Sequence, residues 1–223
     1  MTIHHHPDDE LLVAYAAGEL DEAWSLLIAT HTALCPACRS RVHAAESLGA
    51  ALLEDAVPAA MSDDSLEKTL AIATDTDDAF DDAAVSARAT VSPGDAPVLP
   101  QPLRDYAGGD VDGLKWRRLG SSAFHIPLVA RRGAPTARLF RIPAGTAVPE
   151  HGHNGLELTM VLAGSFVDAD ARFARGDVET ADTDVEHQPV AEAGTDCICL
   201  VLTDAPLRFR GPIARLVQPF IGI

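Results

Sequence analysis

The chain has 223 residues and a mass of 23.5 kDa, which suits one large domain or two small ones. Apolar residues make up 47% of the sequence and its mean hydropathy is +0.07, so a hydrophobic core can form and global disorder is excluded. No apolar stretch reaches the length of about 18 residues that a membrane span needs. The first ten residues lack the basic and apolar segments of a secretory signal, so we expect a cytoplasmic protein with no membrane partner.

The negative charge is concentrated in the N-terminal part of the chain. Residues 1–90 carry 17 acidic and 4 basic side chains, a difference of −13, whereas residues 91–223 carry 16 and 13, a difference of −3. An acidic segment repels the phosphates of nucleic acid and suits a basic protein partner, although solubility alone also explains it. We therefore expect no direct binding to nucleic acid.

Helical patterns occupy the first 75 residues or so. The second predicted helix has a broad apolar face, and Gly18 and Pro36 are suitably placed to end the first helix and to begin the third. The predicted helices are residues 9–18, 22–34, 37–53 and 65–73. Such short helices form a thin core, which usually needs a covalent or metal staple or a partner.

The pattern then changes twice. Five Asp between positions 75 and 82 precede four Pro between positions 93 and 102, a composition typical of a linker. From about Asp105 onward, short apolar runs alternate with Gly, Pro and Asp turns, which predicts an antiparallel sandwich or barrel. The runs are residues 116–119, 137–142, 156–162, 196–203 and 213–217. We expect a helical domain over residues 1–80, a linker over 81–102 and a β domain over 103–223.

A first group of candidate metal ligands lies where the second and third predicted helices meet. His31 and Cys35 are four residues apart and share a helix face, and Cys38 follows one turn later. This set suits tetrahedral Zn²⁺, and a histidine near the N-terminus can supply the fourth ligand. The candidates for that ligand are His4, His5 and His6. A redox-active pair and two inert thiols are the alternatives, but no strand precedes Cys35, as a thioredoxin-like motif would require.

The combination of His6 with His31-x3-Cys35-x2-Cys38 resembles the zinc-binding anti-sigma family. The resemblance covers residues 1–80. It implies a small helical bundle that binds an ECF (group IV) sigma factor and hides its polymerase- and DNA-binding surfaces. It also implies that His6 is the fourth zinc ligand, with the adjacent His5 as the alternative.

A second group of candidate ligands lies in the β domain. His151 and His153 are two residues apart and face the same side of a strand, and Glu157 follows a bend at Asn154-Gly155. Two imidazoles and a carboxylate suit Zn²⁺ or another divalent transition metal.

The spacing from Gly145 through these three residues to Gly164 resembles the first cupin motif. Gly176 and His187 resemble the second motif, which implies His187 as a fourth ligand. The sequence departs from that motif because no Pro-x-Gly precedes His187 and Ala191 replaces the usual Asn.

Two further cysteines, Cys197 and Cys199, occupy alternate positions of a strand pattern, so their thiols share one face. We expect them to be packing residues. Lining of the metal cavity and redox sensing are the alternatives.

Together these features predict a small all-α zinc-binding bundle followed by an all-β cupin barrel, and nearly the whole chain resembles the ChrR-type anti-sigma factors. The resemblance implies that residues 1–80 sequester an ECF sigma factor and that the cupin domain triggers its release under singlet oxygen or organic hydroperoxide stress. The N-terminal zinc site is expected to be closed and structural, and the cupin site to be open to a small molecule or an oxidant. We expect no catalytic residues. The alternative is a cupin metalloenzyme, a dioxygenase or isomerase, with a helical accessory domain.

Overall fold

The structure, a computed structural model, describes residues 2–74, 97–120, 123–131 and 133–209. The chain divides into two compact units, one formed by Met1–Gly49 with Pro97–Ile223 and the other by Ala50–Ala96. None of the described helices is both long and apolar enough to cross a membrane. The predicted run at 213–217 lies outside the described residues, as do residues 75–96 of the predicted linker region.

The four N-terminal helices lie where the sequence predicts them. They are α1 (Asp9–Ala16), α2 (Glu22–Leu34), α3 (Pro36–Glu54) and α4 (Ser65–Thr74). Gly18 has φ of +72° and donates its N–H to the carbonyl oxygen of Tyr15, so the chain leaves the helical conformation just after α1. Cys35 is extended between α2 and α3, and Pro36 begins α3, where its missing N–H costs no helical hydrogen bond.

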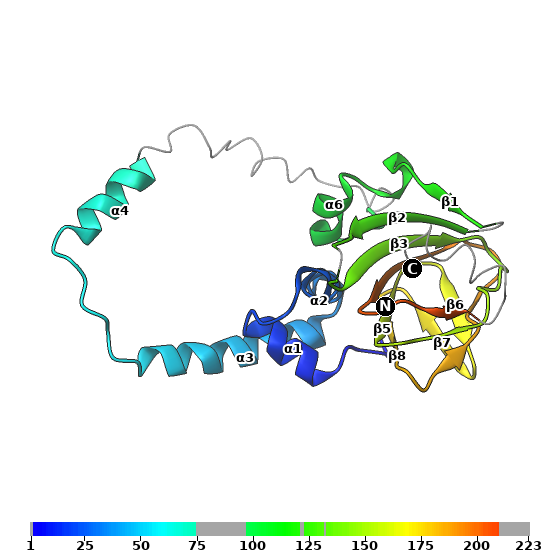
Figure 1. The fold of residues 1–223 in the computed structure, drawn as a ribbon, viewed down its shortest axis with the longest axis horizontal. Helices are drawn as coiled ribbons and strands as arrows, with labels where there is room; N and C mark the ends of the chain where they lie inside the picture. Colours follow the sequence, from blue (N-terminus) through cyan, green and yellow to red (C-terminus); the bar gives the residue numbers. More distant parts are fainter. Residues whose placement is uncertain (1, 75–96, 121–122, 132, 210–223) are drawn as a thin grey trace. The chain divides into compact units, whose positions relative to one another are not determined.

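A further helix, α6 (Gln101–Ala107), begins within the range predicted as linker, and a short 3₁₀ turn, η1 (Val111–Gly113), follows it. α6 contacts α2, and the same α2 contacts strands β3 (Thr136–Ile142) and β11 (Cys197–Thr203) (Figure 1). Leu99 and Leu103 are fully buried in a core that also includes Leu27 of α2 and Leu200 of β11. The helices α1 and α2 therefore share one hydrophobic core with the β domain.

Over its described residues the β domain contains three antiparallel sheets, which confirms the predicted fold class. The largest has six strands in the order β1-β2-β3-β11-β5-β8. Its other members are β1 (Arg117–Leu119), β2 (Ala123–Val129), β5 (Glu157–Ala163) and β8 (Val178–Ala181). The second sheet is β10 (Val190–Ala191), β6 (Ser165–Asp168) and β7 (Ala171–Ala174). The third is β12 (Arg208–Phe209), β4 (His151–Gly152) and β9 (Glu186–His187). Among the described residues, hydrogen bonding does not join these sheets into one closed cylinder.

Strand β5 shows how the large sheet separates two environments. Its alternate residues Leu158, Met160 and Leu162 belong to the core that the sheet shares with the helices. The residues between them face the other side of the sheet, where Val161 joins a second apolar cluster. Cys197 and Cys199 lie in that second cluster with their Sγ atoms 3.4 Å apart, as expected for packing residues that share one face. Glu157 and Thr159 occupy the same face as Val161, so this face also carries the candidate metal ligands.

Candidate metal centres

The first candidate centre combines the N-terminal segment with the junction between α2 and α3. His6, His31, Cys35 and Cys38 each offer a ligand atom, and these four atoms all lie within 4.8 Å of one another. The Nδ1 atom of His6 lies 3.5 Å from Sγ of Cys35 and 3.4 Å from Sγ of Cys38. The structure thus brings His6 to the group, whereas Nδ1 of His5 lies 3.7 Å from the carboxylate of Asp177.

The donor atoms of this centre suit a zinc ion. The Nδ1 atom of His31 lies 3.0 Å from the carbonyl oxygen of Gly176 and donates to it, which leaves Nε2 with its lone pair. That Nε2 atom is buried and has no hydrogen-bond partner among the described residues. Burial, followed by the proximity of His6, lowers the pKa of His31 to about 4, so its imidazole is neutral as a ligand requires.

The two thiols lead to the same conclusion. Burial and the neighbouring Cys35 raise the pKa of Cys38 to about 12 and outweigh the opposing charge of Arg41, so the protein alone disfavours the Cys38 thiolate. A divalent cation supplies the missing positive charge. With two sulfur and two nitrogen donors, the residues fit a closed tetrahedral zinc site.

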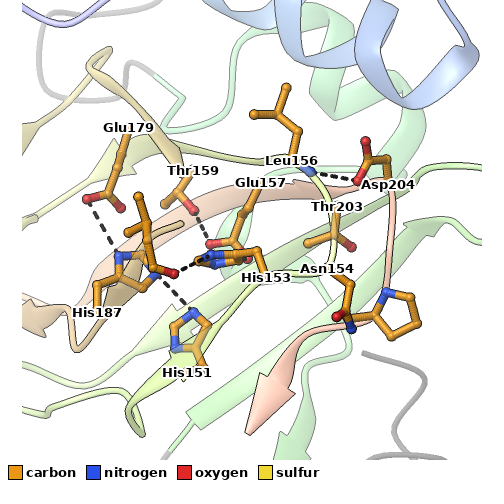
Figure 2. Close-up of polar contacts among 12 residues, drawn as sticks. His151, His153, Asn154, Leu156, Glu157, Thr159, Glu179, His187, Thr203 and Asp204 are labelled. Atoms are coloured by element: carbon orange, nitrogen blue, oxygen red, sulfur yellow. Dashed lines mark hydrogen bonds and ion pairs between the residues drawn. The ribbon is translucent and has the colours of Figure 1, made fainter. Parts of the chain in front are cut away.

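The second candidate centre lies inside the β domain (Figure 2). His151 is on β4, His153 follows that strand, Glu157 begins β5 and His187 ends β9. Their ligand atoms also lie within 4.8 Å of one another, and all four residues are buried. The pairing of β4 with β9 places His151 directly opposite His187, with their Nε2 atoms 3.1 Å apart. Nε2 of His153 lies 3.7 Å from a carboxylate oxygen of Glu157.

Each imidazole of this second centre is oriented by an acceptor at Nδ1. The acceptors are the carbonyl oxygen of Pro149 for His151 at 2.9 Å, the carbonyl oxygen of Val185 for His153 at 3.3 Å and the Asp168 carboxylate for His187 at 2.8 Å. Because Nδ1 carries the proton in each ring, Nε2 carries the lone pair that a metal would bind. The buried Nε2 of His153 has no hydrogen-bond partner among the described residues, which also fits a ligand role.

The electrostatics of the second centre favour a divalent cation. Burial lowers the pKa of His151 to about 4 and raises the pKa of Glu157 to about 7. A bound cation would offset the cost of burying the Glu157 carboxylate. Three imidazoles and one carboxylate suit Zn²⁺ or another divalent transition metal, and they leave further coordination positions for a metal that takes five or six ligands.

Two carboxylates beside this centre were missed from the sequence. Asp168 on β6 lies 2.8 Å from Nδ1 of His187. Glu179 on β8 lies 3.9 Å from the same atom (Figure 2), and burial raises the pKa of Glu179 to about 8. Their strands have only four residues each, too few to show an alternating pattern. An acidic residue between apolar ones, as in Val167-Asp168-Ala169, is the one signal that the sequence offers.

Among the other histidines, His43 is exposed on α3 and pairs with Glu46. His125 is buried and its Nδ1 lies 3.4 Å from the guanidinium of Arg138. Neither belongs to a candidate metal centre.

Comparison with known proteins identifies the relatives of the chain. Residues 106–205 match the family described as the ChrR cupin-like domain. The anti-sigma-E factor ChrR of Cereibacter sphaeroides is 48% identical over 223 residues, which cover all of both chains. The crystal structure of Rhodobacter sphaeroides SigE in complex with the anti-sigma ChrR matches with a TM-score of 0.74 and 46% identity, over 91% of this chain and 100% of that chain. This full-length similarity shows that the chain belongs to the ChrR family of anti-sigma factors.

Proposed function

We propose that this chain sequesters an ECF sigma factor of the SigE type through residues 1–80 and releases it when the cupin domain, residues 103–223, responds to oxidative stress. Its relatives support this role, since one is an anti-sigma-E factor and the other was crystallised in complex with SigE. A cytoplasmic location follows from this function, because sigma factors act with the RNA polymerase there.

One observation in the structure carries the proposal. The second half of α3, the segment after it, and α4 expose large apolar side chains, which soluble proteins otherwise cover. On α3, Leu48 and Leu52 are 66% and 68% exposed, and on α4, Leu66 is 71% exposed. The full set is Leu48, Leu52, Leu53, Val57, Met61, Leu66, Leu70 and Ile72.

The spacing of these residues is that of a helix-binding surface. Leu48 and Leu52 are four residues apart, as are Leu66 and Leu70, so each pair lies along one face of its helix. Apolar anchors at this spacing are typical of amphipathic helices that dock into grooves of a partner protein. We infer that these faces contact the sigma factor.

The two metal centres have different roles in this proposal. His6, His31, Cys35 and Cys38 hold a structural zinc ion that fixes the junction of α2 and α3. His151, His153, Glu157 and His187 hold zinc or another divalent transition metal with a coordination position open to a small molecule or an oxidant. The protein is not an enzyme in this account, and no residue is assigned a catalytic role. Membership of an anti-sigma family favours a non-enzymatic role over the alternative of a cupin metalloenzyme.

The proposal is tested by measuring the affinity of the full chain for a SigE-type sigma factor. Replacing Leu66→Glu together with Leu70→Glu is expected to weaken binding by at least about 100-fold, because two apolar anchors are lost and charges are introduced. Ala71→Glu is the control, since it places one glutamate elsewhere on the exposed surface of α4. Equal affinities for the wild type and the double variant would contradict the proposed surface.

A further inference from the structure

We propose that a turn of the cupin domain supports the N-terminal zinc site, and that Asp177 in this turn is a positioning residue for the zinc ligand His6. The inference rests on the proposed function only in that the site binds zinc. It assigns to the β domain a part in building a metal site whose ligands all come from the first 38 residues.

The first contact is between Asp177 and the segment that carries His6. One carboxylate oxygen of Asp177 accepts hydrogen bonds from the backbone N–H of His4 at 2.7 Å and of His5 at 3.0 Å. The backbone N–H of Val178 donates to the carbonyl oxygen of His5 at 3.1 Å, so the segment pairs with the start of β8. In Figure 1 the chain that precedes α1 runs to this strand. His6 follows directly, which means that its position depends on these three hydrogen bonds.

Asp177 is itself rigidly held. Asp177 is only 3% exposed, and its second carboxylate oxygen accepts a hydrogen bond from the backbone N–H of Ala174 at 2.9 Å. Burial alone would raise the pKa of Asp177, but the N–H groups of Ala174, His5 and His4 outweigh it and hold the pKa below its usual value. The carboxylate is therefore ionised, and charge-assisted hydrogen bonds of this kind are stronger than neutral ones.

The second contact is made by the residue next to Asp177. The carbonyl oxygen of Gly176 accepts the Nδ1–H of His31, which orients that ring and leaves Nε2 for the metal. Gly176 has φ of +91°, a conformation that favours glycine, so the shape of the turn is set by this residue. Consecutive residues of one turn therefore contact the ring of His31 and the backbone of the segment that carries His6.

The same stretch of chain also reaches the second metal centre. Glu179, two residues after Asp177, lies 3.9 Å from Nδ1 of His187 (Figure 2). A hollow of about 540 Å³ lies between the N-terminal segment and β8, and its lining includes His4, His5, His6, Asp168 and Glu179. Residues 176–179 thus contact residues of both centres. A displacement of β8 would therefore also move the segment that carries His6.

The test measures the affinity of the N-terminal site for Co²⁺ in the full-length protein. Cobalt bound to thiolates gives a charge-transfer absorption in the near ultraviolet, so the signal reports Cys35 and Cys38 rather than the His-rich centre. Titration against a competing chelator gives the affinity. Replacing Asp177→Ala is expected to weaken it by about 10–100-fold, the usual effect of losing a residue that orients a metal ligand.

A second variant and a control separate positioning from folding. His4→Pro removes one N–H donor to Asp177 from the N-terminal side and leaves the β domain unchanged, and it is expected to weaken cobalt binding in the same direction. Asp196→Ala is the control, since Asp196 also accepts a backbone N–H, that of Ala144, but within the β domain. Circular dichroism of each variant checks that the sheets are folded.

Wild-type cobalt affinity in a folded Asp177→Ala variant would overturn the inference, as would equal weakening by Asp196→Ala. The proposed function is tested separately, because sigma-factor binding is measured on the same samples. A wild-type chain that binds cobalt normally but not the sigma factor would contradict the proposed function alone.

Discussion

The two candidate metal centres of this chain differ in how the chain assembles them. Three ligands of the N-terminal centre lie within eight residues, at the end of α2 and the start of α3, and include two thiols. The ligands of the second centre come from β4, the residue that follows it, β5 and β9, and they include no thiol. A centre built from local thiols is suited to holding helices together, whereas a centre of imidazoles and one carboxylate inside a sheet domain is suited to exchanging ligands.

The largest effect is expected from removing ligands of the N-terminal zinc site, which should destabilise the helical region far more than the β domain. Replacing Cys35→Ala together with Cys38→Ala removes both thiolates, and the free energy linked to such a zinc site is on the order of 10 kcal/mol. We expect α3 to lose its protection against amide hydrogen exchange and the sigma factor to dissociate, while strand β5 stays protected. His43→Ala, which removes an exposed histidine from α3, should change nothing. Persistent protection of α3 in the double cysteine variant would show that the site is not structural.

The core shared by α2 and the large sheet gives the next largest effect. Leu27 is fully buried in that core, so Leu27→Ala should lower the free energy of unfolding by about 2–5 kcal/mol. Because the core is continuous, thermal unfolding followed by circular dichroism should show the helices and strands losing structure together. Leu48→Ala, at a position 66% exposed, should have little effect. Separate transitions for helices and strands would instead support two independently folding domains.

A smaller effect is expected beside the second centre. Asp168→Asn removes the carboxylate that accepts the Nδ1–H of His187, and this should weaken metal binding there by about 10-fold. The cobalt–thiolate signal of the N-terminal centre should stay the same. Together with Asp177→Ala, this variant tests whether the two centres are supported by different carboxylates, and a loss of the thiolate signal in Asp168→Asn would contradict that separation.

The smallest effect concerns an exposed ion pair between α1 and α3. The guanidinium of Arg41 lies 3.0 Å from the carboxylate of Asp9, and both side chains are more than half exposed. Replacing Arg41→Ala should change the free energy of unfolding by less than about 1 kcal/mol, because water screens such pairs. Chemical denaturation measures this change. A larger loss of stability would show that α1 and α3 depend on each other through charge rather than through the zinc site.

The sequence predicts the local parts of this molecule well. The bounds of α2 follow from its apolar face, and the spacing from His31 to Cys38 is fixed by the helices themselves. Helix α6 was missed because Pro100 and Pro102 suggested a linker, yet proline is well tolerated in the first turn of a helix. Strand β2 was missed because it contains Pro127, which breaks the strand pattern.

Contacts between distant parts of the chain could not be predicted in the same way. The hydrogen bonds from His4 and His5 to Asp177 span more than 170 positions, and no periodicity or motif marks them. Asp168 and Glu179 likewise become candidates for supporting the second centre only because the folded sheets place them beside His187. The domain boundaries at residues 80 and 103 remain a prediction.

The central claim is that the helical region holds the sigma factor while the second metal centre governs its release. The most direct test compares the wild type with His151→Ala and Glu157→Ala, each shown to be folded, in sigma-dependent transcription with and without singlet oxygen or an organic hydroperoxide. Inhibition without the oxidant should persist in both variants, because the α2–α3 junction and the apolar faces of α3 and α4 are unchanged. Release on oxidant treatment should fall sharply. Normal release by both variants would contradict the claim and leave the cupin domain with only a supporting role.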